Sequence, residues 1–232
     1  PGMSRDDLLE TNTKIISTIG KAVKKYCPKA FLICITNPLD AMVSILQLSS
    51  KVKHHMCVGM AGILDSSRMK YFLSKALNVS IKSIETFVLG GHGDTMVPMI
   101  RYTTISGIPI QELIKNKTIS KKRINDILKR TQTGGGEINQ LLKKGSAFYA
   151  PASSAVQMAE SFLKNKKMIL PCAAYLNGEY GVRGLYVGVP VIIGSKGVEK
   201  VIKLQLNAIE KKQFNNSVKA VRKLTNLALK LS

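Results

Sequence analysis

The chain has 232 residues, of which 45% are hydrophobic and 21% are charged, and its formal net charge at pH 7 is +21. This composition is typical of a globular protein with ample material for a core, and it excludes an intrinsically disordered chain. Because no run of about 18 apolar residues occurs, we expect no transmembrane helix and no membrane partner.

The large positive charge raises the alternative of a nucleic-acid-binding protein. The excess is almost entirely lysine, however, and extends from Lys14 to Lys230 in the manner of solvated helix faces. No zinc-finger spacing, aromatic RNA-binding motif or arginine-rich arm accompanies it. We therefore predict no nucleic-acid partner, and a salt-titrated filter-binding assay would test this prediction.

The beginning of the chain predicts alternating helices and strands. A polar segment, residues 1–8, leads into a helix that ends near Tyr26. The continuous apolar run 30–35 is typical of a strand buried on both faces of a parallel sheet. A helix over 39–48 and a second strand over 56–60 follow.

The rest of the chain mixes helices with shorter strands. Asp65 or Ser66 is a plausible N-cap of a helix that reaches Leu77. The strand 83–89 leads into a glycine-rich turn, residues 90–94. The further predicted elements are a strand pair near 99–105, helices over 110–131, 136–144 and 152–163, antiparallel strands over 169–175 and 185–194, and a final helix over 209–231.

Three residues in these segments are candidates for catalysis. His92 lies between glycines, so a ligand can approach its imidazole closely. Asp65 and Arg68 are three residues apart, so one helix face can present both to a single pocket. A carboxylate beside an imidazole fixes its tautomer, and an arginine can hold a substrate carboxylate through two hydrogen bonds. A capped helix with a local ion pair is the alternative interpretation of Asp65 and Arg68.

Two further segments complete the candidate site. Residues 36–40, Thr-Asn-Pro-Leu-Asp, follow the buried strand at its carboxyl end, where open α/β sheets bind their ligands. Arg5 belongs to the polar segment 1–8, from which a cation can move onto a bound anion when a lid closes.

Four motifs in this order resemble those of the lactate/malate dehydrogenase family. They are Pro-Gly-Met-Ser-Arg-Asp-Asp-Leu at 1–8, Ile-Thr-Asn-Pro-Leu-Asp at 35–40, Leu-Asp-Ser-Ser-Arg at 64–68 and Gly-Gly-His-Gly-Asp at 90–94. The resemblance covers essentially the whole chain and is strongest to malate dehydrogenases of the branch similar to lactate dehydrogenase. Lactate enzymes usually carry a different residue at the position of Met3 and lack the triple glycine 134–136, which favours malate.

The resemblance implies an NAD-dependent malate dehydrogenase, which interconverts (S)-malate and oxaloacetate in the tricarboxylic acid cycle. It implies an α/β fold in which residues 1–62 are the later half of a doubly wound Rossmann sheet that binds NAD, and residues 63–232 are an α+β substrate domain. A small dicarboxylate is the implied substrate, and a homodimer or homotetramer is the implied assembly. A lactate-type 2-hydroxy-acid dehydrogenase and a non-catalytic fragment are the alternatives.

The resemblance also implies roles for individual residues. His92 accepts the proton of the substrate hydroxyl, and Asp65 orients its ring. Arg68 holds the substrate carboxylate, Arg5 polarises the C2 oxygen, and Asn37 hydrogen-bonds that oxygen. The residues implied to contact the cofactor are Asn12, Ile35, Thr36 and Asn37.

The glycine-rich turn G-x-G-x-x-G and the acidic ribose-binding residue that the family is expected to carry do not occur in this sequence. The chain also starts within the motif at 1–8, without an initiator methionine. We therefore expect the carboxyl-terminal part of a longer protein, in which the strand at 30–35 becomes a sheet edge. On that expectation, the 232-residue segment alone is poorly soluble or depends on its missing half, binds NAD weakly and turns over little or no malate.

No metal site is expected, because the three histidines and four cysteines show no ligand spacing. The cysteines lie in or beside apolar runs, which favours reduced core thiols and a cytoplasmic location. These residues are Cys27, Cys34, Cys57 and Cys172.

Two pocket details are also expected. The resemblance places Ser146 and Ala147 near the substrate, where their small side chains would leave room for a second carboxylate; ordinary helix–loop packing is the alternative. Glu137 is interpreted as an acid in the first turn of its helix, where the helix dipole favours a negative charge.

Overall fold

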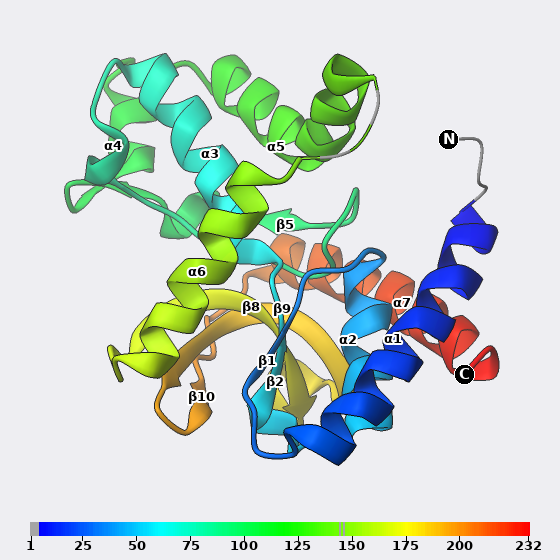
Figure 1. Cartoon of the computed structure of the whole chain (residues 1–232). Helices are drawn as coiled ribbons and strands as arrows, with labels where there is room; N and C mark the ends of the chain where they lie inside the picture. The colour runs from blue at the N-terminus through cyan, green and yellow to red at the C-terminus, as the bar shows by residue number, and fades with distance from the viewer. Residues whose placement is uncertain (1–4, 144, 146) are drawn as a thin grey trace.

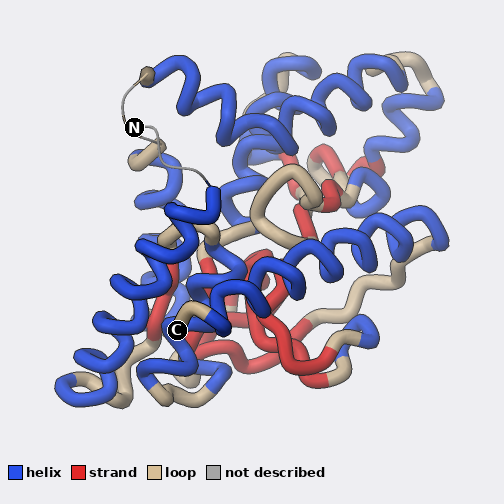
Figure 2. The backbone as a smooth tube through the Cα atoms, turned by 90° about the vertical axis from the view of Figure 1, so that its right-hand side faces the viewer, coloured by secondary structure: helices blue, strands red, loops and turns tan. Residues whose placement is uncertain are grey.

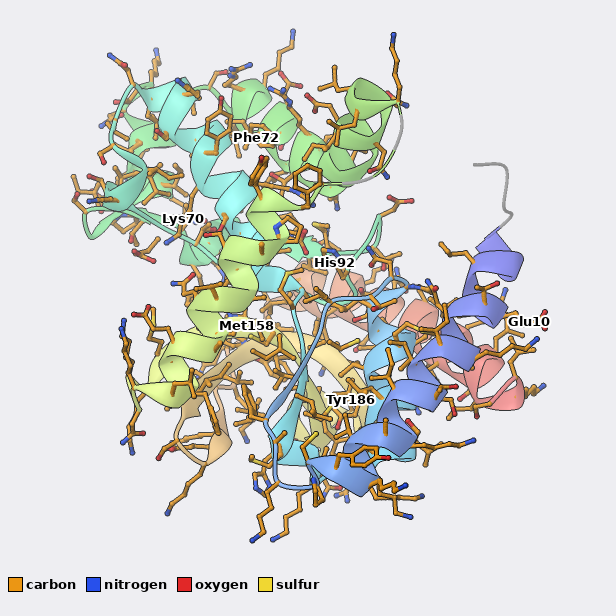
Figure 3. All side chains as sticks on the ribbon, in the orientation of Figure 1. Glu10, Lys70, Phe72, His92, Met158 and Tyr186 are labelled. Atoms are coloured by element: carbon orange, nitrogen blue, oxygen red, sulfur yellow. The ribbon has the colours of Figure 1, made fainter. Side chains whose placement is uncertain are left out.

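The computed structural model describes residues 5–143, 145 and 147–232. Their elements form two regions, one around a five-stranded sheet and one made mainly of helices, which lies above the sheet in Figure 1. His92 lies between the two regions (Figure 3). The predicted α/β class is confirmed.

The large sheet has the strand order β1-β2-β8-β9-β10. Its strands are β1 (Leu32–Cys34), β2 (Cys57–Gly59), β8 (Met168–Asn177), β9 (Arg183–Gly194) and β10 (Gly197–Val201). The two strands predicted near the start of the chain are confirmed as parallel neighbours, β1 and β2. The predicted antiparallel strands are also confirmed, as β8 and β9. A single pair, Gly59 with Ala173, joins β2 to β8 in antiparallel orientation, so the sheet is mixed. Among the described residues, β1 forms one edge of this sheet.

Helices cover both faces of the sheet. They are α1 (Arg5–Tyr26), α2 (Leu39–Ser50), α6 (Tyr149–Leu163) and α7 (Ala208–Lys230). Figures 1 and 2 show α1, α2 and α7 packed together beside the strands. Because successive residues of a strand point to opposite faces, Ala173 and Tyr186 contribute to the core with α1 and α2. Their neighbours Ala174 and Val187 contribute to the core that contains Met158 of α6.

The second region contains α3 (Gly62–Leu77) and α5 (Lys121–Leu142), which pack against each other over a separate apolar core. Its shorter elements are α4 (Ile110–Lys115), β3 (Ile84–Glu85), β4 (Val88–Leu89), β5 (Val97–Pro98), β6 (Thr104–Ile105) and β7 (Ile108–Pro109). Single-turn 3₁₀ helices over the whole fold are η1 (His54–Met56), η2 (Ile81–Ser83), η3 (Ile100–Tyr102) and η4 (Glu179–Gly181). Buried side chains from α3 and α5, among them Met69, Leu73 and Ile127, hold this region together.

Three helix predictions are wrong in detail. The helix after β2 begins at Gly62 with Ala61 as its N-cap, so Asp65 and Ser66 lie inside the helix and neither is the N-cap. The triple glycine 134–136 does not precede a helix but lies inside α5. Glu137 is therefore in the middle of α5, where it forms an ion pair with Arg130 instead of interacting with a helix N-terminus.

The predicted strand 83–89 is interrupted. Its two ends pair with different partners, β3 with β6 and β4 with β5. Between them Thr86 turns inward, and its hydroxyl hydrogen-bonds the hydroxyl of Thr103 at 2.7 Å. The predicted strand pair near 99–105 is correspondingly wrong, because η3 lies within that segment and the strand β6 at its end pairs with β3 and β7.

All four cysteines are free thiols, and three of them are buried in the core. Burial raises the pKa of Cys34 to about 11, which keeps this thiol protonated and unreactive near neutral pH. The prediction of a core position is wrong for Cys27, which follows the end of α1 and is exposed.

Among the described residues, no helix combines the length and the apolar character that crossing a membrane requires.

Candidate active site

The loop that carries His92 is fixed by three neighbouring elements. Gly90 has φ +83° and exchanges two backbone hydrogen bonds with Gly188 of β9, at 2.8 and 3.0 Å. The N–H of Gly91 donates to the Ser217 hydroxyl of α7 at 2.8 Å. The N–H of His92 itself donates to Oδ2 of Asp40 in α2, also at 2.8 Å. The imidazole therefore projects from a turn whose backbone is held on several sides.

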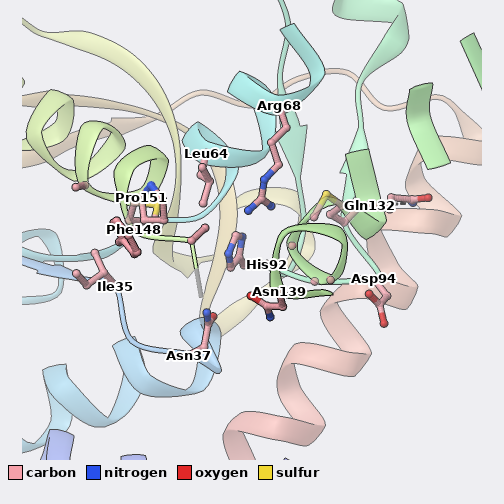
Figure 4. A pocket seen from close by; sticks show the side chains of 17 residues that line it. Ile35, Asn37, Leu64, Arg68, His92, Asp94, Gln132, Asn139, Phe148 and Pro151 are labelled. Carbon is pink, nitrogen blue, oxygen red and sulfur yellow. Dashed lines mark hydrogen bonds between the residues drawn. The ribbon is translucent and has the colours of Figure 1, made fainter. Parts of the chain in front are cut away.

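Asp65 of α3 connects the two other catalytic candidates. Its Oδ2 lies 2.7 Å from Nδ1 of His92, and its Oδ1 accepts a hydrogen bond from Nη1 of Arg68 at 3.1 Å. The Asp65 side chain is 1% exposed. An ionised carboxylate can only accept, so Nδ1 carries the proton and Nε2 of the neutral imidazole has a free lone pair. Figure 4 shows the Arg68 guanidinium pointing toward His92 across this site.

The surroundings of His92 favour its protonated form. Burial opposes the charge of the imidazolium, but the charge of Asp65, the hydrogen bond to Asp65 and the charge of Asp40 together outweigh burial. The net result is a pKa of His92 above its ordinary value of 6.5. Such a group can exchange a proton with a ligand near neutral pH.

The triple glycine of α5 makes room for Arg68. A Cβ on Gly134 would lie 3.2 Å from Cδ of Arg68, and a Cβ on Gly135 would lie 3.9 Å from its two terminal nitrogens. The Nε of Arg68 is buried and has no hydrogen-bond partner among the described residues. The glycines therefore let the arginine lie flat along α5 while its terminal nitrogens reach the pocket.

This arrangement predicts opposite effects of Gly134→Ala on stability and on substrate binding. Alanine should favour the helix by up to about 1 kcal/mol, but the new methyl group should displace Arg68 and raise KM several-fold. Gly136→Ala is the matched variant, because no heavy atom lies within 4 Å of the added Cβ. Gly136→Ala should raise the thermal unfolding temperature about as much as Gly134→Ala does, but it should raise KM less. An unchanged KM in Gly134→Ala would show that Gly134 does not accommodate Arg68.

The pocket in front of His92 and Arg68 has a volume of about 700 Å³. It lies between the carboxyl end of β1, the start of α3, the glycine segment of α5 and the start of α6. The residues that line it are Ile35, Asn37, Met60, Leu64, Arg68, His92, Gly93, Asp94, Met96, Gln132, Gly135, Gly136, Asn139, Ala147, Phe148, Pro151 and Ala152. The wall is mixed, with apolar side chains beside Ile35 and polar ones around His92.

The segment after β1 places its predicted residues around this pocket. Ile35 is 52% exposed and lines the pocket with Asn37. Thr36 lies between them and is half-buried. Asn12 of α1 donates from Nδ2 to the Asn37 carbonyl at 2.6 Å. Asn12 therefore fixes the backbone of this segment.

Some predicted residues fall outside the described part of the chain. Arg5 is the first residue of α1, and its side chain is not described. Met3 and Ser146 also lie outside the described residues. Ala147, predicted beside Ser146 as a small pocket residue, lines the pocket. No group of three or more potential metal ligands comes together in the part of the chain that the structure describes.

Sequence reasoning missed three polar residues near the site. Gln132 and Asn139 of α5 line the pocket because α5 continues through the glycines. The third is Asp40, which is buried and bonded to the backbone of His92. The sequence feature that could have identified Asp40 is an acidic residue between the apolar residues Leu39 and Ala41, in the first turn of a helix that follows a buried strand.

Comparisons with known proteins identify the family of this chain. The family model described as lactate/malate dehydrogenase, NAD binding domain, matches residues 1–59. The model described as lactate/malate dehydrogenase, alpha/beta C-terminal domain, matches residues 63–231.

Solved structures of both enzyme types are similar to this chain. The malate dehydrogenase from Cryptosporidium parvum is 47% identical with a TM-score of 0.95, and the match covers 97% of this chain and 72% of that one. The lactate dehydrogenase from Eimeria maxima with NADH and oxamate is 50% identical with a TM-score of 0.96, covering 100% and 70%. The malate dehydrogenase from Plasmodium falciparum is 40% identical with a TM-score of 0.95, covering 99% and 73%. The chain belongs to the lactate/malate dehydrogenase family of oxidoreductases, and its cofactor is NAD.

Proposed function

We propose that this protein is a malate dehydrogenase, which interconverts (S)-malate and oxaloacetate with NAD. The observation that supports an active 2-hydroxy-acid dehydrogenase is the placement of Asp65 between Arg68 and His92 at one pocket. A proton acceptor and a cation for a carboxylate lie together there, as the oxidation of a hydroxy acid requires.

We assign the proton transfer to His92. In malate oxidation, Nε2 accepts the hydroxyl proton, while the hydrogen bond from Nδ1 to Asp65 fixes the tautomer and stabilises the imidazolium. Arg68 binds the carboxylate next to the reacting carbon through its terminal nitrogens. Asn37, from the end of β1, donates its side-chain amide to the C2 oxygen. Arg5 is proposed to polarise the same oxygen as charge develops on it.

The residues at the end of β1 fit a nicotinamide. Ile35 is exposed on the pocket wall although it ends an apolar run, and it offers an apolar surface to a flat ring. The hydrogen bond between Asn12 and the Asn37 carbonyl keeps this backbone in place. We propose Asn12, Ile35, Thr36 and Asn37 as the cofactor contacts. When bound, NAD supplies the ring that takes up or returns the hydride.

The raised pKa of His92 predicts opposite pH dependences for the two directions. Reduction of oxaloacetate needs protonated His92, so its kcat/KM should fall as the pH rises through the raised pKa of His92. Oxidation of malate needs the neutral ring, so its kcat/KM should rise over the same range. Initial rates measured from about one pH unit below to about three pH units above the ordinary pKa of histidine would check this. Parallel profiles in the two directions would contradict the role of His92.

Malate is preferred over lactate as the substrate because small residues leave room for a second carboxylate. Gly135, Gly136 and Ala147 line the pocket with little or no side chain. Lactate is the second candidate, because the Eimeria maxima lactate dehydrogenase is 50% identical to this chain. The test is kcat/KM for oxaloacetate and for pyruvate with NADH on the full-length protein. A higher value for pyruvate would assign the lactate reaction, and no turnover of either would favour a non-catalytic protein.

The remaining proposals concern organisation. We propose an NAD-binding unit over 1–62 and a substrate unit over 63–232, supported by the ranges of the two family models. We also propose a homodimer or homotetramer in the cytoplasm. Sedimentation equilibrium would give the mass of the assembly, and cell fractionation would give the compartment.

A further inference from the structure

Asp40 is a buried acid beside the proposed proton acceptor. It lies in the first turn of α2 and is 6% exposed. Its Oδ2 accepts the hydrogen bond from the backbone N–H of His92, and its Oδ1 is buried without a hydrogen-bond partner among the described residues. Burying a carboxylate with one unpaired oxygen is costly. Such a cost suggests a function that an asparagine or an apolar residue would not serve.

The titratable groups that interact with Asp40 come from three elements. They are His92 of the loop after β4, Asp65 of α3 and Cys34 of β1. Arg68 of α3 acts on the same imidazole from beyond Asp65. The buried residues of α7 that approach this turn, Ser217 and Val221, are uncharged. Charged residues that the structure describes on α1, such as Glu10 and Lys14, are exposed and pair with each other.

Asp40 also links the two groups proposed to contact the same substrate oxygen. Asn37 lies three residues before it, next to Pro38, the N-cap of α2. The hydrogen bond from His92 N–H to Oδ2 therefore ties the histidine turn to the segment that carries Asn37. A shift of the turn relative to α2 would change the distance between the imidazole and the Asn37 amide, and small displacements of this kind reduce rates strongly.

We propose that Asp40 is a positioning residue of the active site, which holds the His92 backbone against α2 and places a second negative charge beside the imidazole. The proposal rests on the proposed function, in which His92 exchanges a proton with the substrate. Asp40 does not touch the pocket and acts only through His92.

The electrostatics around Asp40 agree with this role. Burial raises the pKa of Asp40 to about 6, opposed by the hydrogen bond and the charge of His92. The charge of Asp40 in turn contributes to the raised pKa of His92. The two groups are coupled, so loss of the carboxylate should make protonated His92 less stable.

The test is an NMR titration of the imidazoles in Asp40→Asn. Asparagine keeps an oxygen that can accept from His92 N–H but removes the charge. We expect the titration midpoint of His92 to fall by about 0.5–1 pH unit. The chain has three histidines, so His92→Gln assigns the signal. His54 and His55 of η1 serve as internal references for an intact fold.

Ser217→Ala is the matched control. It removes the other side-chain acceptor of this turn, the one bonded to Gly91 N–H, without changing any charge. The His92 midpoint should stay at the wild-type value in this variant. If it falls as much as in Asp40→Asn, or if Asp40→Asn leaves it unchanged, the charge role of Asp40 is excluded.

Kinetics separate this inference from the proposed function. In Asp40→Asn, kcat for oxaloacetate reduction at pH 8 should fall with little change in KM, because Arg68 is untouched, and the pH profile should move to lower pH. A rise in KM with an unchanged kcat would contradict a positioning role. If instead His92→Gln retains full activity, the proposed function itself fails whatever the titration shows.

Discussion

Replacing Asp65 by asparagine should lower kcat/KM for oxaloacetate reduction by about 10²- to 10⁴-fold. The amide can donate to Nδ1 of His92, which would move the proton of the neutral imidazole to Nε2, so that Nε2 could no longer accept the hydroxyl proton in malate oxidation. The variant also loses the charge that stabilises the imidazolium at a distance of 2.7 Å. The loss should therefore appear mainly in kcat, measured by NADH consumption at saturating substrate.

Two measurements make the Asp65 result specific. Removing one partner of a buried ion pair can cost about 3–5 kcal/mol of stability, so thermal unfolding must show that the variant is folded at the assay temperature. The ¹⁵N shifts of His92 should then report the changed tautomer directly. Asp126→Asn, an exposed acid on α5, is the control and should keep wild-type rates. Activity of Asp65→Asn within about threefold of wild type would exclude the orienting role.

Long periodic segments made most of the fold predictable. The helices α1 and α7 lie within one residue of the expected ends at Tyr26 and at 209–231, because their apolar stripes and lysine faces repeat over many turns. The apolar run at 30–35 correctly indicated a strand beside 56–60. Short pairings such as β3 with β6 were not predictable, because two-residue strands have no period and depend on distant partners.

At the glycines of α5, helix propensity alone predicts the wrong secondary structure. Three consecutive glycines disfavour a helix by about 1 kcal/mol each, so the sequence predicts a break at 134–136. The helix nevertheless continues through them, and Gly134 faces Arg68, whose Cδ would lie only 3.2 Å from an added Cβ. The unfavourable helix propensity of the glycines therefore accompanies close packing at the pocket. The contact between Arg68 of α3 and the glycines of α5 cannot be predicted from the sequence of either helix alone.

The residues of the candidate site that belong to chemical motifs could be predicted from the sequence. The residues whose role depends on tertiary packing could not. The motif residues Asp65, Arg68 and His92 come together as the family resemblance implied. Asp40 belongs to a motif that the sequence analysis quoted, yet its partner is a backbone N–H 52 residues away in the chain. Only the packing of α2 against the histidine turn reveals that contact.

Replacing Arg68 by lysine should lower kcat/KM for oxaloacetate by about 10²- to 10³-fold. The guanidinium offers two parallel donors to a carboxylate, and two charge-assisted hydrogen bonds are worth about 3–4 kcal/mol together. Lysine keeps the charge but provides one compact ammonium group, which cannot reproduce the fork. Most of the loss should appear in KM, with a smaller loss in kcat from a less well-positioned substrate.

Chemical rescue makes this prediction specific to the guanidinium. Arg68→Ala should be less active than Arg68→Lys, and added guanidinium chloride at low concentration should restore part of its activity. Removing the Arg68 side chain leaves a space beside Gly134 and Gly135. Because these two residues have no side chains to fill it, the small cation can enter. Arg123→Lys, on the exposed face of α5, is the control and should keep the wild-type KM. An unchanged KM in Arg68→Lys, or equal rescue by ammonium and guanidinium, would show that Arg68 does not bind the substrate carboxylate through a bidentate pair.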